Sequence, residues 1–108
     1  MFVDFVRPLR SYDGSPLIDS DPKMKGAPIL LRQVCCNALT ALIQGEVLTG
    51  EEKLHRWKLA ERIHKEARLD LKVEEIALLK KLIDQVYPIL VVAPSWELLE
   101  NNAAPVEH

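Results

Sequence analysis

The sequence predicts a mainly α-helical domain, a bundle of three to four helices with a short N-terminal β-hairpin arm. The 108 residues contain 48% hydrophobic but only 6% aromatic residues, a balance typical of helical globular domains. From residue 28 onward apolar residues recur at helical spacing, whereas residues 1–26 combine short apolar runs with an Asp-Gly dipeptide. We therefore divide the chain into an arm (1–26), a helical core (27–100) and a loose tail (101–108).

Charge and hydropathy limit the possible settings of this protein. Sixteen acidic and 14 basic residues give a net charge of −2, so the chain as a whole is not attracted to nucleic acid or anionic membranes. No apolar run approaches the roughly 20 residues of a membrane span, and residues 1–4 do not resemble the start of a signal peptide. We expect a cytoplasmic protein with no membrane partner and no cofactor.

In the arm, Asp13-Gly14 lies between two apolar runs and indicates a hairpin, because glycine accepts a positive φ without steric cost. Pro8 and Pro16 each remove a ladder donor, which favours an edge or a flap over the middle of a sheet. An isolated two-stranded ribbon is only marginally stable. Phe2 and Phe5 are therefore expected to pack on the helices or on another subunit.

The first helix is predicted at about 28–44, because Pro28 suits a first helical position and Gly45 suits a helix end. Its apolar residues follow the amphipathic spacing: Leu31, Val34, Cys35, Ala38, Leu39 and Leu42. Cys35 and Cys36 are the only cysteines, and neighbours on a helix point about 100° apart, which is poor geometry for a mutual disulfide. Without CxxC spacing or a nearby histidine, they indicate buried apolar residues rather than a metal site.

The second helix is predicted at 50–67. Thr49 and Glu52 have the spacing of a capping box, in which each side chain accepts the backbone amide of the other residue. One face is apolar, and the opposite side carries the chain's basic stripe: His55, Lys58, Arg62 and Lys65.

Val73–Tyr87 is the predicted central helix, although Lys72 stands where a capping Ser or Thr would be expected. Its apolar arc covers roughly 180°, wider than the roughly 100° of an ordinary surface helix, so it should have partners on two sides. The arc consists of Ile76, Leu78, Leu79, Leu82, Ile83, Val86 and Tyr87. Pro88 should end or kink this helix.

The segment 89–99 allows two interpretations. Residues 89–92 are β-branched enough for a strand, but their place before Pro94 and the Trp96–Leu99 block suits a broken terminal helix. We favour the helix.

Arg56 and Glu75 each fall inside the apolar arc of a predicted helix. Either each has ordinary exposure near a helix end, or they form an interhelical or intersubunit salt bridge with each other.

Catalytic groups do not converge in the sequence. His55 and His64 fall on opposite sides of their helix, which prevents a shared substrate or metal. Paired glutamates at 51–52 and 74–75 stand at helix starts, where the helix dipole favours acidic residues without any catalytic need. We therefore expect neither an enzyme nor a metal site.

The sequence resembles a group of small proteins encoded by tailed bacteriophages and prophages. The resemblance rests on Phe2–Phe5, Asp13-Gly14, Asn37–Leu39, Thr49–Lys53, Glu74–Leu78, Lys81–Ile83 and Trp96–Glu100. It implies a setting, the cytoplasm of a bacterial host, and no particular activity.

The apolar arcs at 28–44 and 73–87 are wider than a small bundle readily covers, and the arm has open strand edges. We therefore predict a non-catalytic protein-interaction or self-assembly module, expected to be a homo-oligomer. The arm and residues 89–99 would form the contacts, with the candidate residues Phe2, Phe5, Val91 and Trp96. The alternative is a small nucleic-acid-binding regulator that uses the basic stripe.

Overall fold

A computed structural model describes residues 2–18 and 27–101, so the tail expected beyond Asn101 lies outside the described residues. The described chain is mainly helical with a small antiparallel sheet, which confirms the predicted fold class. The elements in chain order are β1 (Phe2–Asp4), α1 (Leu31–Thr40), α2 (Gly50–Lys65), β2 (Arg68–Asp70), α3 (Val73–Val86) and α4 (Ile89–Asn101).

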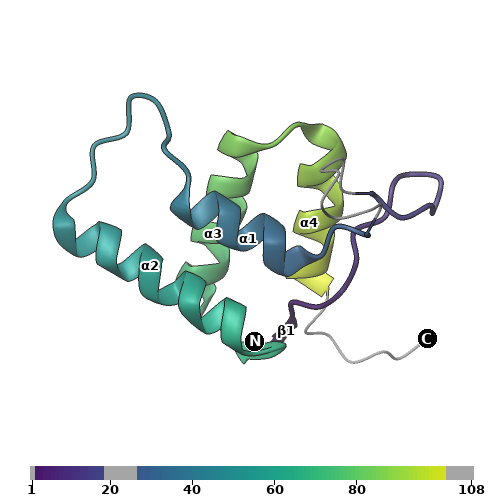
Figure 1. Cartoon of the computed structure of the whole chain (residues 1–108), viewed down its shortest axis with the longest axis horizontal. Helices are drawn as coiled ribbons and strands as arrows, with labels where there is room; N and C mark the ends of the chain where they lie inside the picture. Colours follow the sequence, from purple (N-terminus) through teal and green to yellow (C-terminus); the bar gives the residue numbers. More distant parts are fainter. Residues whose placement is uncertain (1, 19–26, 102–108) are drawn as a thin grey trace.

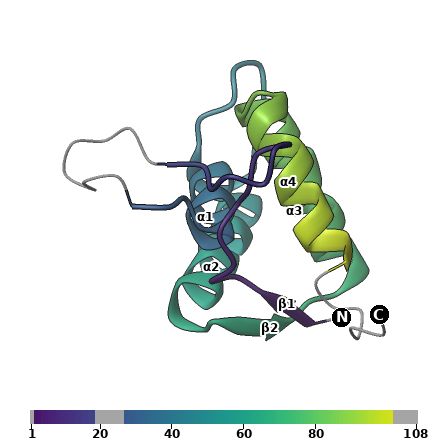
Figure 2. The same ribbon diagram turned by 90° about the vertical axis from the view of Figure 1, so that its right-hand side faces the viewer.

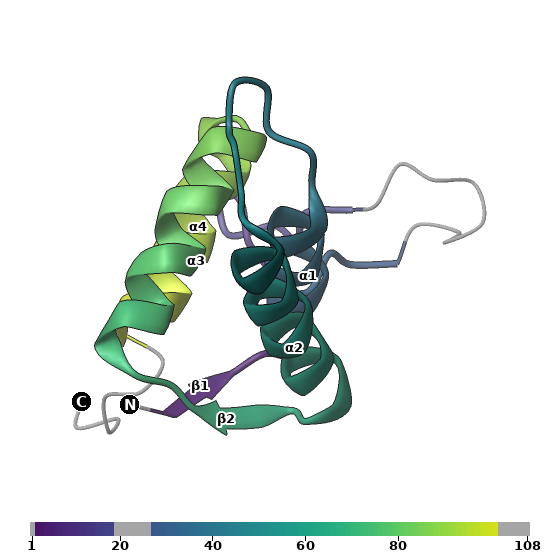
Figure 3. The same ribbon diagram turned by 90° about the vertical axis from the view of Figure 1, so that its left-hand side faces the viewer.

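The four helices form two pairs. In Figure 3, α1 and α2 lie on one side, α3 and α4 lie on the other, and the two strands cross one end of the bundle. Contacts join α1 to each of the other three helices, and α3 packs between α1 and α4 (Figure 1). The predicted two-sided packing of the 73–87 helix is therefore confirmed, although α1 shares the central position.

The strand β1 pairs with β2, in the register Phe2↔Asp70, Val3↔Leu69 and Asp4↔Arg68 (Figure 2). The sequence pattern had not marked Arg68–Asp70 as a strand, because three alternating residues between two helices resemble a turn. The Asp13-Gly14 turn is also present. It is closed by a 2.7 Å hydrogen bond from the Ser11 amide to the Ser15 carbonyl, and Gly14 has a φ of 88°.

The arm sets the start of α1 three residues later than predicted. The backbone amides of Leu31 and Arg32 donate to the carbonyls of Arg7 and Phe5, at 3.0 and 2.9 Å. Residues 28–30 are extended instead, because the Ile29 carbonyl accepts from the Leu9 amide and the Ile29 amide donates to the Leu17 carbonyl, both at 2.9 Å. The carbonyls of a distant segment thus supply partners that the first turn of a helix lacks.

The predicted end of the first helix at about residue 44 is wrong, because α1 ends at Thr40 and Ala41 is extended. Leu42 is therefore exposed in the following loop instead of packing on the core, and Gly45 belongs to a turn of that loop.

The bounds of the other helices follow local signals. The Thr49 capping box forms as predicted, with hydrogen bonds of 3.0 and 3.1 Å to Glu52. The uncapped position Lys72 starts α3 because its amide donates to the Glu75 carboxylate at 2.9 Å. Residues 89–99 lie within α4, which confirms the helical interpretation of this segment. Pro88 separates α4 from α3. All seven residues of the predicted α3 arc belong to the core or pack against it.

Candidate interaction surface

The four residues proposed for partner binding occupy different environments. Phe5 is fully buried in the core, so it is not on a surface that a partner could reach. Phe2 is 53% exposed on β1, and the Arg68 guanidinium lies 5.7 Å from its ring centroid. The prediction that Phe5 binds a partner is therefore wrong. The chain turns after β1 and directs Phe5 toward α1, where the Phe5 carbonyl accepts a hydrogen bond from the Arg32 amide.

Trp96 lies half-buried on α4 and is held by α3. Its indole Nε1 donates to the Lys80 carbonyl at 3.0 Å, and the Lys80 ammonium lies 4.7 Å from the ring centroid while it pairs with Glu100. Val91, also half-buried, lines a hollow of about 200 Å³ with Ile18 and Tyr87. Val91 and Trp96 therefore belong to the surface of α4, and Phe2 lies apart on β1.

A larger groove, which neither Val91 nor Trp96 lines, lies between the N-terminal turn and α4. Its volume is about 620 Å³. We call it the arm-helix groove, lined by Arg10, Ser11, Tyr12, Ile89, Leu90, Ala93, Pro94 and Glu97. Tyr12 is 96% and Ile89 83% exposed, so large apolar surfaces remain in water at its rim.

Hydrogen bonds within the turn hold Tyr12 at the rim. The Asp13 carboxylate accepts from the Ser15 hydroxyl at 2.6 Å and from the Ser15 amide at 3.0 Å. The bond from the Ser15 hydroxyl, and to a smaller extent the bond from the Ser15 amide, hold the pKa of Asp13 below its usual value. The Arg10 guanidinium donates to the Gly14 carbonyl at 3.0 Å, which ties the segment before the turn to the turn itself.

Sequence reasoning named the two segments that form this groove, but none of its four candidate residues is among those that line it. Tyr12 precedes the Asp-Gly turn, and Ile89 and Ala93 have the i, i+4 spacing of one helix face. Those signals were present, but nothing local to either segment indicates that the turn folds against α4.

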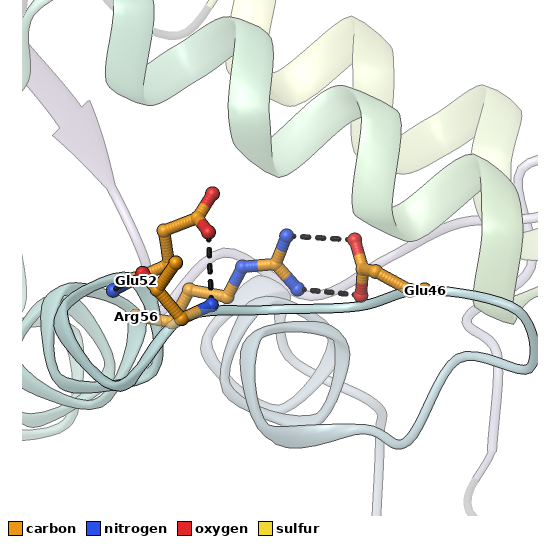
Figure 4. Close-up of polar contacts among 4 residues, drawn as sticks. Glu46, Glu52 and Arg56 are labelled. Carbon is orange, nitrogen blue, oxygen red and sulfur yellow. Dashed lines mark hydrogen bonds and ion pairs between the residues drawn. The ribbon is translucent and has the colours of Figure 1, made fainter.

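The charged residues flagged inside apolar arcs are paired, though not with each other. Arg56 is 8% exposed and forms a bidentate salt bridge to Glu46, with hydrogen bonds of 2.9 and 2.8 Å (Figure 4). Glu75 pairs with Arg62 at 3.0 Å. The Arg56 hydrogen bonds lower the pKa of Glu46. This pair fastens the loop 41–49 to α2, and it leaves Leu42 and Val47 almost fully exposed.

The basic stripe of the alternative hypothesis lies on one exposed side of α2. His55, Lys58, Arg62 and Lys65 are all exposed. Arg62 is engaged by Glu75, and His55 borders a hollow of about 240 Å³ that Glu51 and Glu52 also line. These carboxylates reduce the positive potential that a phosphate backbone would meet.

Cys35 is buried and Cys36 is partly buried. Burial raises the pKa of the Cys35 thiol, and burial also raises the pKa of Cys36, whose thiol donates to the Ala60 carbonyl at 3.5 Å. Since the thiolate is the nucleophilic form, a raised pKa disfavours reaction at neutral pH. Across residues 2–18 and 27–101, no group of three or more His, Cys, Asp or Glu could hold a metal ion. Nor is any described helix long and apolar enough to cross a bilayer.

The arm-helix groove offers apolar side chains at its rim and the charged groups of Arg10 and Glu97. Such a surface suits the burial of apolar side chains from another protein, with the charges setting orientation. The chain matches no protein-family model, no curated protein and no solved structure.

Proposed function

We propose that this protein is a non-catalytic interaction module that docks a protein through the arm-helix groove. The observation that carries the proposal is the exposed apolar rim, with Tyr12 96%, Ile89 83% and Leu90 46% exposed around one groove. Fully burying a side chain of this size contributes about 1.5–3 kcal/mol. A tyrosine beside aliphatic residues is also a frequent anchor of protein interfaces.

The difference in burial between the side chains of α4 supports this role. One side of the helix serves the core, because Leu99 is fully buried and the Trp96 indole donates to the Lys80 carbonyl of α3. Ile89 and Leu90 face outward instead. A partner that covered them would complete the burial of the helix without rearranging the fold.

Affinity capture with two matched variants tests this function. Leu90→Asp introduces a charge into the groove, and Leu54→Asp introduces the same charge on α2, where Leu54 is 53% exposed compared with 46% for Leu90. We expect Leu90→Asp to weaken binding of the captured protein by about tenfold or more, whereas Leu54→Asp retains it. Equal binding by both variants would place the interface elsewhere.

The second candidate is a small nucleic-acid-binding regulator, which is supported by the exposure of Lys58 and Lys65 on one side of α2. This hypothesis predicts binding to DNA or RNA that weakens steeply as the salt concentration rises and is lost in the double variant Lys58→Glu with Arg62→Glu. If the protein left the electrophoretic mobility of nucleic acid unchanged at low salt, the nucleic-acid hypothesis would be wrong. The phage and bacterial-cytoplasm setting is part of the proposal for either function.

A further inference from the structure

Another hollow, of about 420 Å³, lies beside the link between α3 and α4. Figure 1 shows these two helices side by side, with the link at one end. Two aromatic residues, one acidic residue and three small or aliphatic residues line the hollow: Tyr87, Trp96, Asp84, Ile89, Val92 and Ala93. Neither charged residue of the arm-helix groove lines it. The hollow therefore differs in chemistry from the groove.

Hydrogen bonds hold both aromatic side chains of the hollow in place. The Trp96 indole Nε1 donates to the Lys80 carbonyl of α3 at 3.0 Å. The Tyr87 hydroxyl accepts from the Asn37 side-chain amide of α1 at 3.2 Å. Each bond uses the polar end of the side chain and leaves the ring as the part that meets a ligand. The two rings are thus positioned in advance, which lowers the entropic cost of binding.

The carboxylate that lines the hollow lacks a counter-ion. Lys80 stands one helical turn before Asp84 on α3, a spacing that permits an ion pair. The Lys80 ammonium instead pairs with Glu100 and lies 4.7 Å from the Trp96 ring centroid. Asp84 is exposed, and within residues 2–18 and 27–101 its carboxylate forms no ion pair or hydrogen bond. This surface therefore carries one negative charge in excess.

Aromatic rings beside an unpaired carboxylate favour an organic cation. The face of an aromatic ring attracts a cation within about 6 Å, and the Lys80 ammonium already contacts Trp96 in this way. A quaternary ammonium suits the hollow better than a primary one. Its methyl groups can pack on Ile89 and Val92, and it has no N–H donor that would be left unpaired.

We propose that this hollow binds a small quaternary ammonium compound, held by the rings of Tyr87 and Trp96 and by the Asp84 carboxylate. The inference goes beyond the proposed function, because it assigns a small ligand to a different surface and requires no protein partner. The rings supply contact with the methyl groups, and Asp84 supplies the opposite charge.

Titration with choline and 3,3-dimethyl-1-butanol tests the site, because the alcohol has the same shape without the charge. The two tryptophans of the full chain give two indole N–H signals in NMR spectra, recorded at constant ionic strength in sodium chloride. We expect choline to shift the Trp96 signal saturably and to bind about tenfold more tightly than the alcohol. The signal of Trp57, which lies on α2, should not move. Ethanolamine, a primary ammonium, should bind more weakly than choline.

Substitution of Asp84 and Tyr87 separates the charge from the rings. Asp84→Asn keeps the shape of the side chain and should weaken choline binding by about fivefold, while binding of the alcohol stays unchanged. Its control is Glu61→Gln, which removes an exposed carboxylate from α2 and should bind choline like the wild type. Tyr87→Leu should also weaken choline binding, whereas Tyr87→Phe keeps the ring and should retain it. Thermal unfolding by circular dichroism establishes that each variant is folded.

Four results would overturn the inference: no saturable shift of the Trp96 signal in choline, equal binding of choline and the alcohol, equal binding of choline and ethanolamine, or unchanged choline binding in Asp84→Asn. The proposed function is judged separately by affinity capture with Leu90→Asp, because Leu90 lines the arm-helix groove and not this hollow.

Discussion

At the scale of single residues, Phe2 and Phe5 have similar sequence settings and opposite environments. Phe2 is 53% exposed, and Phe5 is fully buried beside the start of α1. The sequence predicted that both must pack against something, which is correct for Phe5 and only partly so for Phe2. The difference depends on the turn after β1, which the pattern of residues 2–6, four apolar residues among five, does not reveal.

Replacing these two phenylalanines should separate core from surface. Phe5→Ala should lower the free energy of unfolding by about 3–5 kcal/mol, because it leaves a cavity at a fully buried position. Phe2→Ala should cost about 1 kcal/mol or less, since it mainly removes a partly exposed cation-π contact with Arg68. Urea titration monitored by circular dichroism measures both. Similar losses for the two variants would contradict the placement of Phe5.

The Glu46 and Arg56 pair should give the protein an acid-sensitive contribution to stability. The pKa of Glu46 is lowered from 4.5, chiefly by the Arg56 hydrogen bonds, so the ionised carboxylate favours the folded state. This contribution is fully present above the unfolded pKa of about 4.5 and is lost as the pH falls through the lower folded value. Above that window it does not vary with pH.

Glu46→Gln should therefore reduce the dependence of stability on acid. The variant is expected to be less stable than the wild type at pH 7, and the difference should shrink as the pH falls below about 4.5. Urea midpoints measured across the acid range test this. The pKa of Glu52 is also lowered, chiefly by the hydrogen bond from the Thr49 amide. The loss of stability in acid that Glu52 causes should therefore occur in both proteins. A difference that stayed constant with pH would show that Glu46 contributes through packing instead.

At the scale of elements, the features that the sequence predicted depend on neighbouring residues. The capping box of α2, the apolar arc of α3 and the break at Pro88 can each be recognised within a few positions. The features that it missed depend on distant ones. The start of α1 follows from hydrogen bonds to the carbonyls of Arg7 and Phe5, and β2 exists because β1 pairs with it.

The capping box allows a test at this scale. Thr49→Ala removes the acceptor of the Glu52 amide and should destabilise the protein by about 1 kcal/mol. Thr49→Ser keeps the hydroxyl and should stay close to the wild type. Thermal unfolding at neutral pH compares the three proteins. Equal losses for both variants would indicate that the threonine methyl group, rather than its hydroxyl, supports the start of α2.

At the scale of the whole molecule, the N-terminal segment is part of the bundle's core. Val3, Phe5 and Leu9 are all fully buried, and the β1 and β2 pairing joins the first residues to the link between α2 and α3. The arm-helix groove depends on this placement of the N-terminal segment, because one of its walls comes from the turn after Arg10 and the other from α4. Two segments from opposite ends of the chain meet there, which is why helical periodicity could not reveal the groove.

Deletion of residues 1–9 should therefore unfold the chain instead of releasing an appendage. Each of the three buried side chains contributes about 2–5 kcal/mol, and together they rival the 5–15 kcal/mol that stabilises a typical domain. Tyr12→Ala, which alters a residue of the same segment that is 96% exposed, should change stability by no more than about 0.5 kcal/mol. Circular dichroism of the truncated chain should show lost helicity and no cooperative transition. A truncated chain that kept the wild-type denaturation midpoint would make the N-terminal segment dispensable to the bundle, and the wall that it gives the groove would then lack a fixed position.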